Sequence, residues 1–567
     1  MSSITIQNMG KYTYLNESES FWDKDKKIPD NHKVRIGMID NSTGKSYYKQ
    51  EYINRLKSRG EPVDGMLVWE DLRKAKRITD PANIVSLEEA AFEVLNNIKD
   101  FGVTYFFRHI ANDIGLIQVL KKALPNLWEE LFMLACYLVA EDKPVMYCED
   151  WISENECPDI GSMSSQKVSD LLAGFGYSQR SRFYKEWYAL ISEREYIALD
   201  ITSVSTYSNN IIDGEWGYNR DGEDLPQVNI CMLFGESSRL PVYQTIYSGS
   251  LKDVSTLKTT LGEFTAMTGT SDIMVVLDKG FYSKNNIDTM ISDEEDDICY
   301  KFLISVPFTT KFAKDLVLSE RKDIDNIDNV IFTSDKPIRG IHKLRTWASK
   351  KKKIHAHVFF DPEKAVKEQN ELYGYVAHLK ALALKNPDDE KAANDFRRYL
   401  IIRKSKKTQE GITINIRNDV VSKEIQTAGW FVLISNHIKE TQEAHDVYRM
   451  KDVVEKAFHG YKNNIGIDRL RVHGDDRMQN KVFVAFIALI LSSHINTVMS
   501  EKKLFGKMTF KKLLITLTKL KTATINGTKI LRPLTKEQKL IFESFGIKPP
   551  EQEAIDGACI RCSEKNV

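Results

Sequence analysis

The run Ile273-Met-Val-Val-Leu-Asp278 ends an apolar stretch with an acid, and Tyr196-Ile-Ala-Leu-Asp200 shows the same pattern earlier in the chain. Short apolar runs of this kind are typical of buried strands in a sheet. Adjacent central strands place their ends side by side, so we expect the two carboxylates to be neighbours, where they would repel each other without a cation between them. Either Asp taken alone is better explained as a helix cap or a turn residue.

The segments around these acids indicate an α/β core. Between residues 195 and 306 the patterns predict three strands, a helix, a strand, a helix and a strand. The expected strands are Tyr196–Leu199, Gln227–Phe234, Val242–Tyr247, Ile273–Leu277 and Tyr300–Val306, and the first expected helix is Thr256–Met267.

The chain, with 567 residues and a mass of 65.1 kDa, is too long for one compact core. Period-2 and period-3.6 patterns divide it into six expected parts. These are a β-containing segment at 1–78, a helical domain at 79–194, a core in two parts at 195–306 and 441–500, an insertion at 307–440 and a helical tail at 501–567.

Charge gives no whole-molecule argument for nucleic-acid binding, because 80 Lys and Arg stand against 79 Asp and Glu. The signs separate only locally, in the acidic run 293–297 and the basic runs 350–353 and 403–407. Each run fits a solvated loop as well as a binding surface.

The sequence also bounds the compartment. No secretory signal is visible at the N-terminus, so we expect a cytoplasmic protein. The longest apolar run, Val482–Leu491, is about half of what a membrane-spanning helix requires, and we expect a buried helix there. Cys559 and Cys562 have no second ligand pair close by, which makes a zinc site a weak interpretation.

A third acid lies on an expected helix between residues 448 and 462. At 100° per residue, one stripe of that helix carries Tyr448, Lys451, Glu455, His459 and Lys462. Glu455 therefore lies among cations on a polar face. A solvated helix with an ordinary i,i+4 pair between Lys451 and Glu455 would show the same pattern.

The order and spacing of these residues resemble the Tyr-Arg-Glu-Lys signature of a large branch of bacterial insertion-sequence DD(E) transposases. The signature spans Tyr448, Lys451, Glu455 and Lys462, and the likeness extends from about residue 10 to residue 548. The stretches 200–205, 217–227 and 278–282 look like that family's characteristic blocks. Lys451 stands where the family usually has Arg, which removes bidentate phosphate recognition.

The resemblance implies a ribonuclease-H-like, retroviral-integrase-type core with a β-containing insertion and an N-terminal helical DNA-binding region. It implies that Asp200, Asp278 and Glu455 are the catalytic residues and the ligands of two Mg²⁺ or Mn²⁺ ions. Oxygen ligands suit such hard cations, and no Cys or His cluster near these acids favours zinc. The activity it implies is cleavage of DNA ends and joining of their 3′ ends to a target.

Family members with a β-rich insertion between the second Asp and the Glu open the flanking DNA through a hairpin, and the separation of 177 positions from Asp278 to Glu455 leaves room for such an insertion. Tyr448, Lys451 and Lys462 are then expected to contact phosphates, with Arg220 as a further candidate and Trp347 as a base-stacking residue.

The implied partners are the terminal inverted repeats and target DNA, bound by a homodimer that assembles on DNA in the bacterial nucleoid, with no membrane. Two rival readings stay open: a structure-specific nuclease on the same fold, and an inactive DNA-binding protein derived from a transposase.

Overall fold

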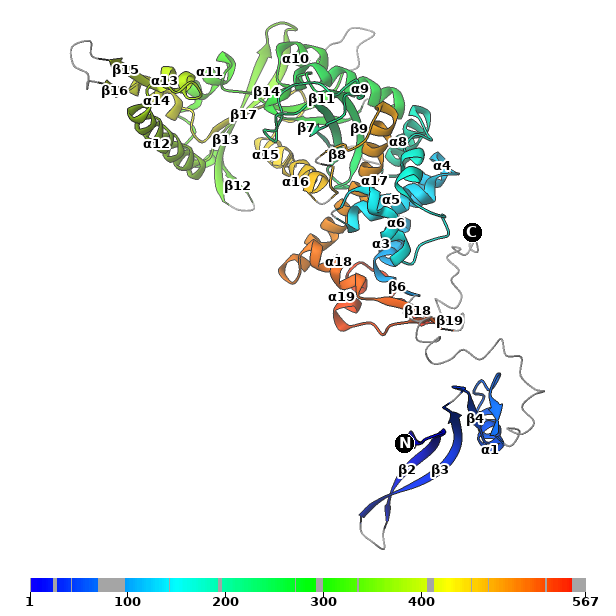
Figure 1. Ribbon diagram of the computed structural model, residues 1–567. Helices are drawn as coiled ribbons and strands as arrows, with labels where there is room; N and C mark the ends of the chain where they lie inside the picture. The colour runs from blue at the N-terminus through cyan, green and yellow to red at the C-terminus, as the bar shows by residue number, and fades with distance from the viewer. Residues whose placement is uncertain are drawn as a thin grey trace.

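A nine-stranded mixed sheet is the centre of this computed structural model (Figure 1). The structure describes residues 2–23, 28–41, 43–69, 97–141, 143–191, 196–270, 272–291, 299–333, 336–404, 412–449, 451–463, 465–467, 469–525 and 528–552. The strand order in the sheet is β12-β13-β14-β17-β11-β10-β7-β8-β9. Everything below concerns these residues.

The predicted order of strands and helices in the core is confirmed. Strands β7 (Tyr196–Ser205), β10 (Met274–Leu277) and β11 (Lys301–Ser305) run parallel, and β8 (Gln227–Gly235) and β9 (Pro241–Ser248) continue the sheet antiparallel. Helices α9 (Asp253–Thr268) and α10 (Lys284–Met290) and the short η4 (Lys279–Phe281) connect them. All nine residues of β8 are buried, as expected for a strand covered on both faces.

The apolar run 482–491 lies in the 27-residue helix α17 (Asp475–Glu501), which packs on α5, α16 and β9. Among the described residues, α17 alone is long and apolar enough to cross a membrane by length and composition. Since 78% of its most apolar window is buried inside the protein, it is a core helix, as predicted.

The expected insertion is divided between the main sheet and a smaller unit. Strands β12 (Val330–Phe332), β13 (Pro337–Trp347), β14 (Lys352–Phe360) and β17 (Trp430–Ser435) extend the main sheet beyond β11, with α11 (Lys311–Glu320) and η5 (Ile327–Asn329) beside them. The smaller unit has its own apolar cluster. Its elements are α12 (Pro362–Lys385), α13 (Ala393–Tyr399), β15 (Leu400–Lys404), β16 (Ile412–Ile416) and α14 (Asn418–Ile425).

Helices fill the stretch before the core. They are α3 (Gly102–Asp113), α4 (Leu116–Ala123), α5 (Trp128–Ala140), α6 (Cys148–Glu154), α7 (Ser165–Leu171) and α8 (Tyr177–Ile191), with η3 (Val145–Tyr147) between α5 and α6. Nine consecutive residues of α5 are buried, which explains its weak amphipathic pattern. Residues 70–96, at the start of the expected helical domain, lie outside the described residues.

The N-terminal segment contains a five-stranded sheet and one helix. Its elements are β1 (Ser2–Met9), β2 (Tyr12–Asp23), β3 (Ile28–Asp40), β4 (Ser46–Tyr48), β5 (Leu67–Val68) and α1 (Gln50–Ser58). Strands β3 and β4 pair antiparallel, so the expected β-containing segment is present.

The tail after residue 501 is only partly helical, which corrects the expectation. It contains η6 (Leu504–Gly506), α18 (Phe510–Thr518), β18 (Lys521–Ile525), β19 (Thr528–Leu531) and α19 (Lys536–Ser544). The β-branched Thr and Ile residues of this stretch favour the two strands. Strand β18 also pairs with β6 (Ile98–Asp100), so the C-terminal tail and the segment that leads into α3 share one sheet. Cys559 and Cys562 lie outside the described residues.

One histidine in the extended part of the sheet links stability to pH. His357 on β14 is 0% exposed, and its Nε2–H donates to the carbonyl of Ile438 at 3.2 Å. Its Nδ1 is buried without a hydrogen-bond partner. Burial lowers the pKa of His357 to about 4. The unfolded chain therefore takes up a proton below about pH 6.5 that the folded protein does not accept until about pH 4.

We predict that His357→Gln makes the free energy of unfolding less dependent on pH between pH 7 and 4.5. The wild-type imidazole loses on the order of 2–3 kcal/mol of stability over that range, because a folded-state pKa below the unfolded value destabilises as pH falls. Urea denaturation at the two pH values measures the difference. His378→Gln, at an exposed position on α12, is the control, and equal pH dependence in all three proteins would contradict the prediction.

Candidate active site

Two aspartates lie at matched positions on neighbouring parallel strands. Leu199 of β7 pairs with Leu277 of β10, and the next residue on each strand is Asp200 or Asp278. Asp278 follows the last residue of β10, and its Oδ1 accepts the amide of Lys279 at 2.6 Å. Asp200 lies in the middle of β7 and not at a strand end as expected, because residues 201–205 go on pairing with β8. The sheet itself therefore brings the two carboxyl groups together.

Burial makes the charge on Asp200 costly. Burial is the largest of the effects that together raise the pKa of Asp200 to about 6; the ammonium of Lys451 opposes the shift, and the neighbouring Asp278 adds to it. The amide of Ile201 donates to Asp200 Oδ1 at 2.9 Å. This carboxylate is thus ionised at neutral pH with the help of a nearby cation.

Lys451 bridges Glu455, the third acid, and Asp278. Lys451 Nζ lies 3.1 Å from Asp278 Oδ2 and 2.9 Å from Glu455 Oε1. The oxygens of Asp278 and Glu455 are therefore no further apart than the sum of those two distances. Glu455 faces the aspartates, and its side chain remains 58% exposed.

The expected helix over residues 448–462 falls on two described helical stretches, α15 (Thr441–Arg449) and α16 (Lys451–Asn463), and Met450 between them lies outside the described residues. Lys451 and Glu455 occupy the first turns of α16, one helical turn apart. Helix α16 packs on β7, so its start lies over the strand that carries Asp200.

The donor set suits a hard divalent cation, since all three groups are carboxylates. In the described part of the chain, no group of three or more acidic, Cys or His side chains is already arranged around one metal position. Lys451 lies between Asp278 and Glu455 and supplies positive charge there. The chemistry of the site fits a metal, and the lysine is the group that a metal would displace or share.

Tyr448 touches the same aspartate. Its hydroxyl lies 3.4 Å from Asp278 Oδ1, and burial raises the pKa of Tyr448 to about 12, so it stays protonated and donates. Burial alone would lower the pKa of Lys451, but the nearby Asp278 and Glu455 outweigh it and raise the pKa above the ordinary value. Both residues that were expected to contact phosphate are therefore bound to carboxylates of the candidate site in this structure.

The other expected DNA contacts are also paired with acids. Lys462 Nζ lies 2.6 Å from Asp221 Oδ2. The Arg220 guanidinium holds both oxygens of Asp253, at 2.6 and 2.7 Å. Each cation could contact a phosphate only by exchanging its present partner.

Trp347 is not available for stacking, which corrects the expectation. It is 9% exposed, its indole N–H donates to Asp288 at 2.6 Å, and its ring meets Phe312 edge to face. Side chains alternate between the two faces of β13, and this one faces α11. The lysine run next to it in the sequence therefore does not indicate that the side chain is exposed.

A cleft of about 1260 Å³ opens beside the acids, between the core and the smaller unit of the insertion. Asp278, Tyr448, Lys451 and Glu455 line one wall. The residues that line the rest include seven cations, Lys279, Lys314, Lys336, Lys364, Arg398, Lys423 and Arg449, and four acids, Asp361, Glu368, Glu424 and Asp452. The sequence did not predict these cations, because they stand singly and form no basic run. The basic run 350–353, which the sequence does show, does not line the cleft.

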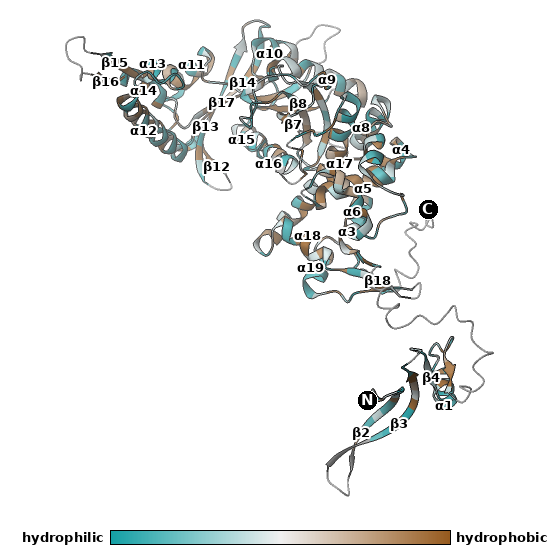
Figure 2. Cartoon of the chain, in the orientation of Figure 1, coloured by the Kyte–Doolittle hydropathy of each residue, from teal (hydrophilic) through white to brown (hydrophobic). Residues whose placement is uncertain are grey.

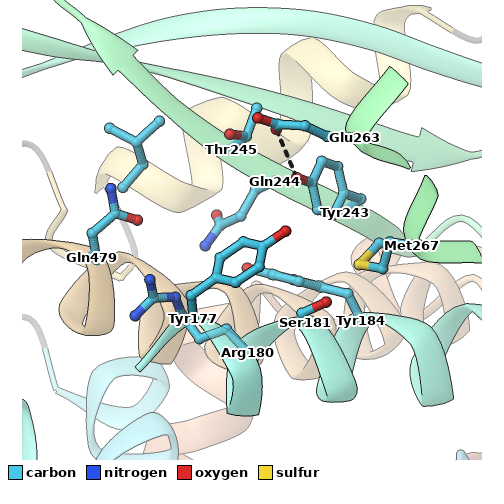
Figure 3. A pocket seen from close by; sticks show the side chains of 11 residues that line it. Tyr177, Arg180, Ser181, Tyr184, Tyr243, Gln244, Thr245, Glu263, Met267 and Gln479 are labelled. Carbon is cyan, nitrogen blue, oxygen red and sulfur yellow. Dashed lines mark hydrogen bonds between the residues drawn. The ribbon is translucent and has the colours of Figure 1, made fainter. Parts of the chain in front are cut away.

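A second cavity of about 280 Å³ lies between α8, β9, α9 and the start of α17 (Figure 3). Tyr177, Arg180 and Tyr184 line it from α8, and the Tyr243 hydroxyl donates to Glu263 at 3.1 Å across it (Figure 3). None of the three acids lines this cavity.

A family model described as a transposase DDE domain matches residues 191–491, more than half of the chain and all three acids. The chain belongs to the DDE transposase family. Transposases of this family use divalent metal ions, in keeping with the carboxylate set. The mixed α/β order of the core fits the ribonuclease-H-like core of such enzymes.

Comparisons of this DDE transposase with curated proteins and solved structures do not identify further site residues. No curated protein matches the chain. Five chains of solved structures match, among them a piggyBac transposase synaptic complex with hairpin DNA, at 10% identity and a TM-score of 0.28. That likeness covers 63% of this chain and 59% of the piggyBac chain, and it is too weak to place any residue.

We predict that Lys451→Met lowers the free energy of unfolding in EDTA by about 1–3 kcal/mol, because the carboxylates lose the ammonium that compensates them. We also expect Mg²⁺ to raise the Tm of this variant more than that of the wild type, since the carboxylates that have lost the ammonium bind a divalent ion more favourably. Thermal denaturation with and without MgCl₂ measures both effects.

The matched control is Lys456→Met, which removes an exposed lysine from the same helix. If Mg²⁺ shifts the Tm of the two variants equally, Lys451 does not occupy the cation position of the site.

Proposed function

We propose that this transposase binds the terminal inverted repeats of a bacterial insertion sequence, cuts the ends by metal-dependent phosphodiester hydrolysis and joins the 3′ ends to target DNA. The observation that carries the proposal is the convergence of three carboxylates from separate parts of the chain. Asp200 and Asp278 are neighbours on parallel strands, and Lys451 links Asp278 to Glu455. Acids gathered in this way repel one another unless they serve a cation.

Asp200, Asp278 and Glu455 would hold two Mg²⁺ or Mn²⁺ ions, which when bound neutralise charge on the attacking and leaving oxygens. The protein's own groups prepare that arrangement. The Lys279 amide and the Tyr448 hydroxyl both donate to Asp278 Oδ1 and orient its carboxylate. Lys451 lowers the cost of ionising Asp200.

The cleft supports a DNA end at this site. Seven cations outside the catalytic cluster line it, and they outnumber the four further acids there, three of which pair with Lys336, Lys364 and Arg398. Phosphates are bound mainly through such charges. Because the smaller unit of the insertion forms the opposite wall, we propose that it holds the flanking strand during opening through a hairpin intermediate.

Cutting both ends together requires two active sites, so we propose a homodimer that assembles on DNA, acting in the cytoplasm at the bacterial nucleoid. Tyr448, Lys451, Lys462 and Arg220 remain proposed phosphate contacts, each after release from the acid it now holds.

We predict that Asp278→Asn, Asp200→Asn and Glu455→Gln each lower cutting and joining by at least roughly 10³-fold while leaving DNA binding unchanged, because metal positioning is lost and surface charge contacts are kept. Paired terminal-repeat duplexes with Mg²⁺, resolved on denaturing gels, report nicks, hairpins and joined products. Glu371→Gln, an exposed acid on α12, is the control.

The rival functions give different products on the same gels. Cutting without any 3′-end transfer identifies a structure-specific nuclease. Binding without cutting, even for the wild type, identifies an inactive derivative. Equal cutting by Asp278→Asn and the wild type would remove the site assignment.

A further inference from the structure

The segment from Lys502 to Lys539 is strongly basic although the whole chain is not. It holds one acid, Glu537, and eleven cations: Lys502, Lys503, Lys507, Lys511, Lys512, Lys519, Lys521, Lys529, Arg532, Lys536 and Lys539. The net charge of the whole chain is +1, so this segment is balanced by acidic stretches elsewhere. Such segregation is the electrostatic footprint of a polyanion-binding surface.

Most of these cations are exposed and carry no counter-ion. Lys521 pairs with Asp100 and Lys529 with Glu156, each at 2.7 Å. The other nine are exposed and make no salt bridge with any described residue. Nine unpaired charges of one sign repel each other, and a bound polyanion would relieve that repulsion.

The fold presents these side chains on the outside of a compact unit. Leu513, Leu514 and Leu517 bury the inner face of α18, which leaves Lys511 and Lys512 exposed. Helix α18 packs on α3 and α19, and the turn between α17 and α18 carries Lys502, Lys503 and Lys507 (Figure 1). Helix α19 lies on the same unit and is coloured mostly as hydrophilic residues in Figure 2.

The helical region that was expected to bind DNA has the opposite charge. Residues 97–191 contain nine Lys and Arg against thirteen Asp and Glu. Helices α3 to α8 therefore offer little attraction for a phosphate backbone. The pairing of β18 with β6 attaches the basic C-terminal unit directly to this acidic region.

We propose that the unit from Lys502 to Lys539 is a binding surface for the phosphate backbone of duplex DNA, and that it supplies the attraction that the helical region lacks. Ten of its eleven cations are lysines, which act as point charges and lack the bidentate fork that reads guanine. The surface therefore binds without regard to sequence, outside the catalytic cleft. This inference rests on the proposed function only in taking DNA as the substrate.

The test uses the full chain in EDTA, where no cutting occurs, and a fluorescent 40-bp duplex of unrelated sequence. We expect the triple variant Lys511→Gln, Lys512→Gln, Lys519→Gln to bind at least roughly tenfold more weakly at 100 mM salt, because about three phosphate contacts are lost. The slope of log affinity against log salt should become shallower by about 3.

The control carries the same charge change elsewhere: Lys311→Gln, Arg321→Gln, Lys322→Gln, three exposed positions on α11 and the turn after it. We expect it to bind as the wild type does, and Lys511→Arg, Lys512→Arg, Lys519→Arg to keep the affinity. Equal losses in the two Gln variants would overturn the proposal.

Vesicles containing anionic phospholipid test the competing occupant. If they bind the wild type more tightly than the duplex does at the same salt, the surface is a membrane contact and the proposal fails. Because every measurement is made without metal, failure here leaves the catalytic proposal standing, and loss of cutting in Asp278→Asn leaves this one standing.

Discussion

The pairing of Leu199 with Leu277 is the constraint on which the site depends. Parallel register places Asp200 and Asp278 next to each other whatever the rest of the chain does, and burial makes that proximity unfavourable. Lys451 compensates the two carboxylates and at the same time holds Glu455 beside them. One ammonium group thus couples the sheet to α16, and the three carboxylates of the candidate site gather around it.

The insertion changes what surrounds this site more than the site itself. Because β14 and β17 continue the sheet from β11, half of the insertion is rigidly part of the core. The other half, with its own apolar cluster, stands across the cleft and contributes cations to it. A substrate lying in the cleft would therefore touch two units with separate cores, which can respond differently to what is bound.

Local sequence patterns were enough to predict the order of elements from β7 to β11 and the burial of α17, because apolar runs report burial directly. They could not place Asp200 inside its strand, since Thr202 and Ser203 interrupt the apolar run while still pairing with β8. They suggested the stripe with Lys451 and Glu455, but not that Lys451 would turn toward Asp278. Trp347 was misplaced because a neighbouring charge run says nothing about which face of a strand a side chain occupies.

The three-stranded sheet β19-β18-β6 joins residues more than 400 positions apart in the chain. During synthesis, residues 98–100 cannot pair with their neighbouring strand until residues beyond 520 have left the ribosome. Helix α3 lacks part of its packing until then as well, since Gly102 packs directly against the backbone of Leu517. The region therefore matures late, and a nascent chain that already contains all three acids still lacks a finished scaffold.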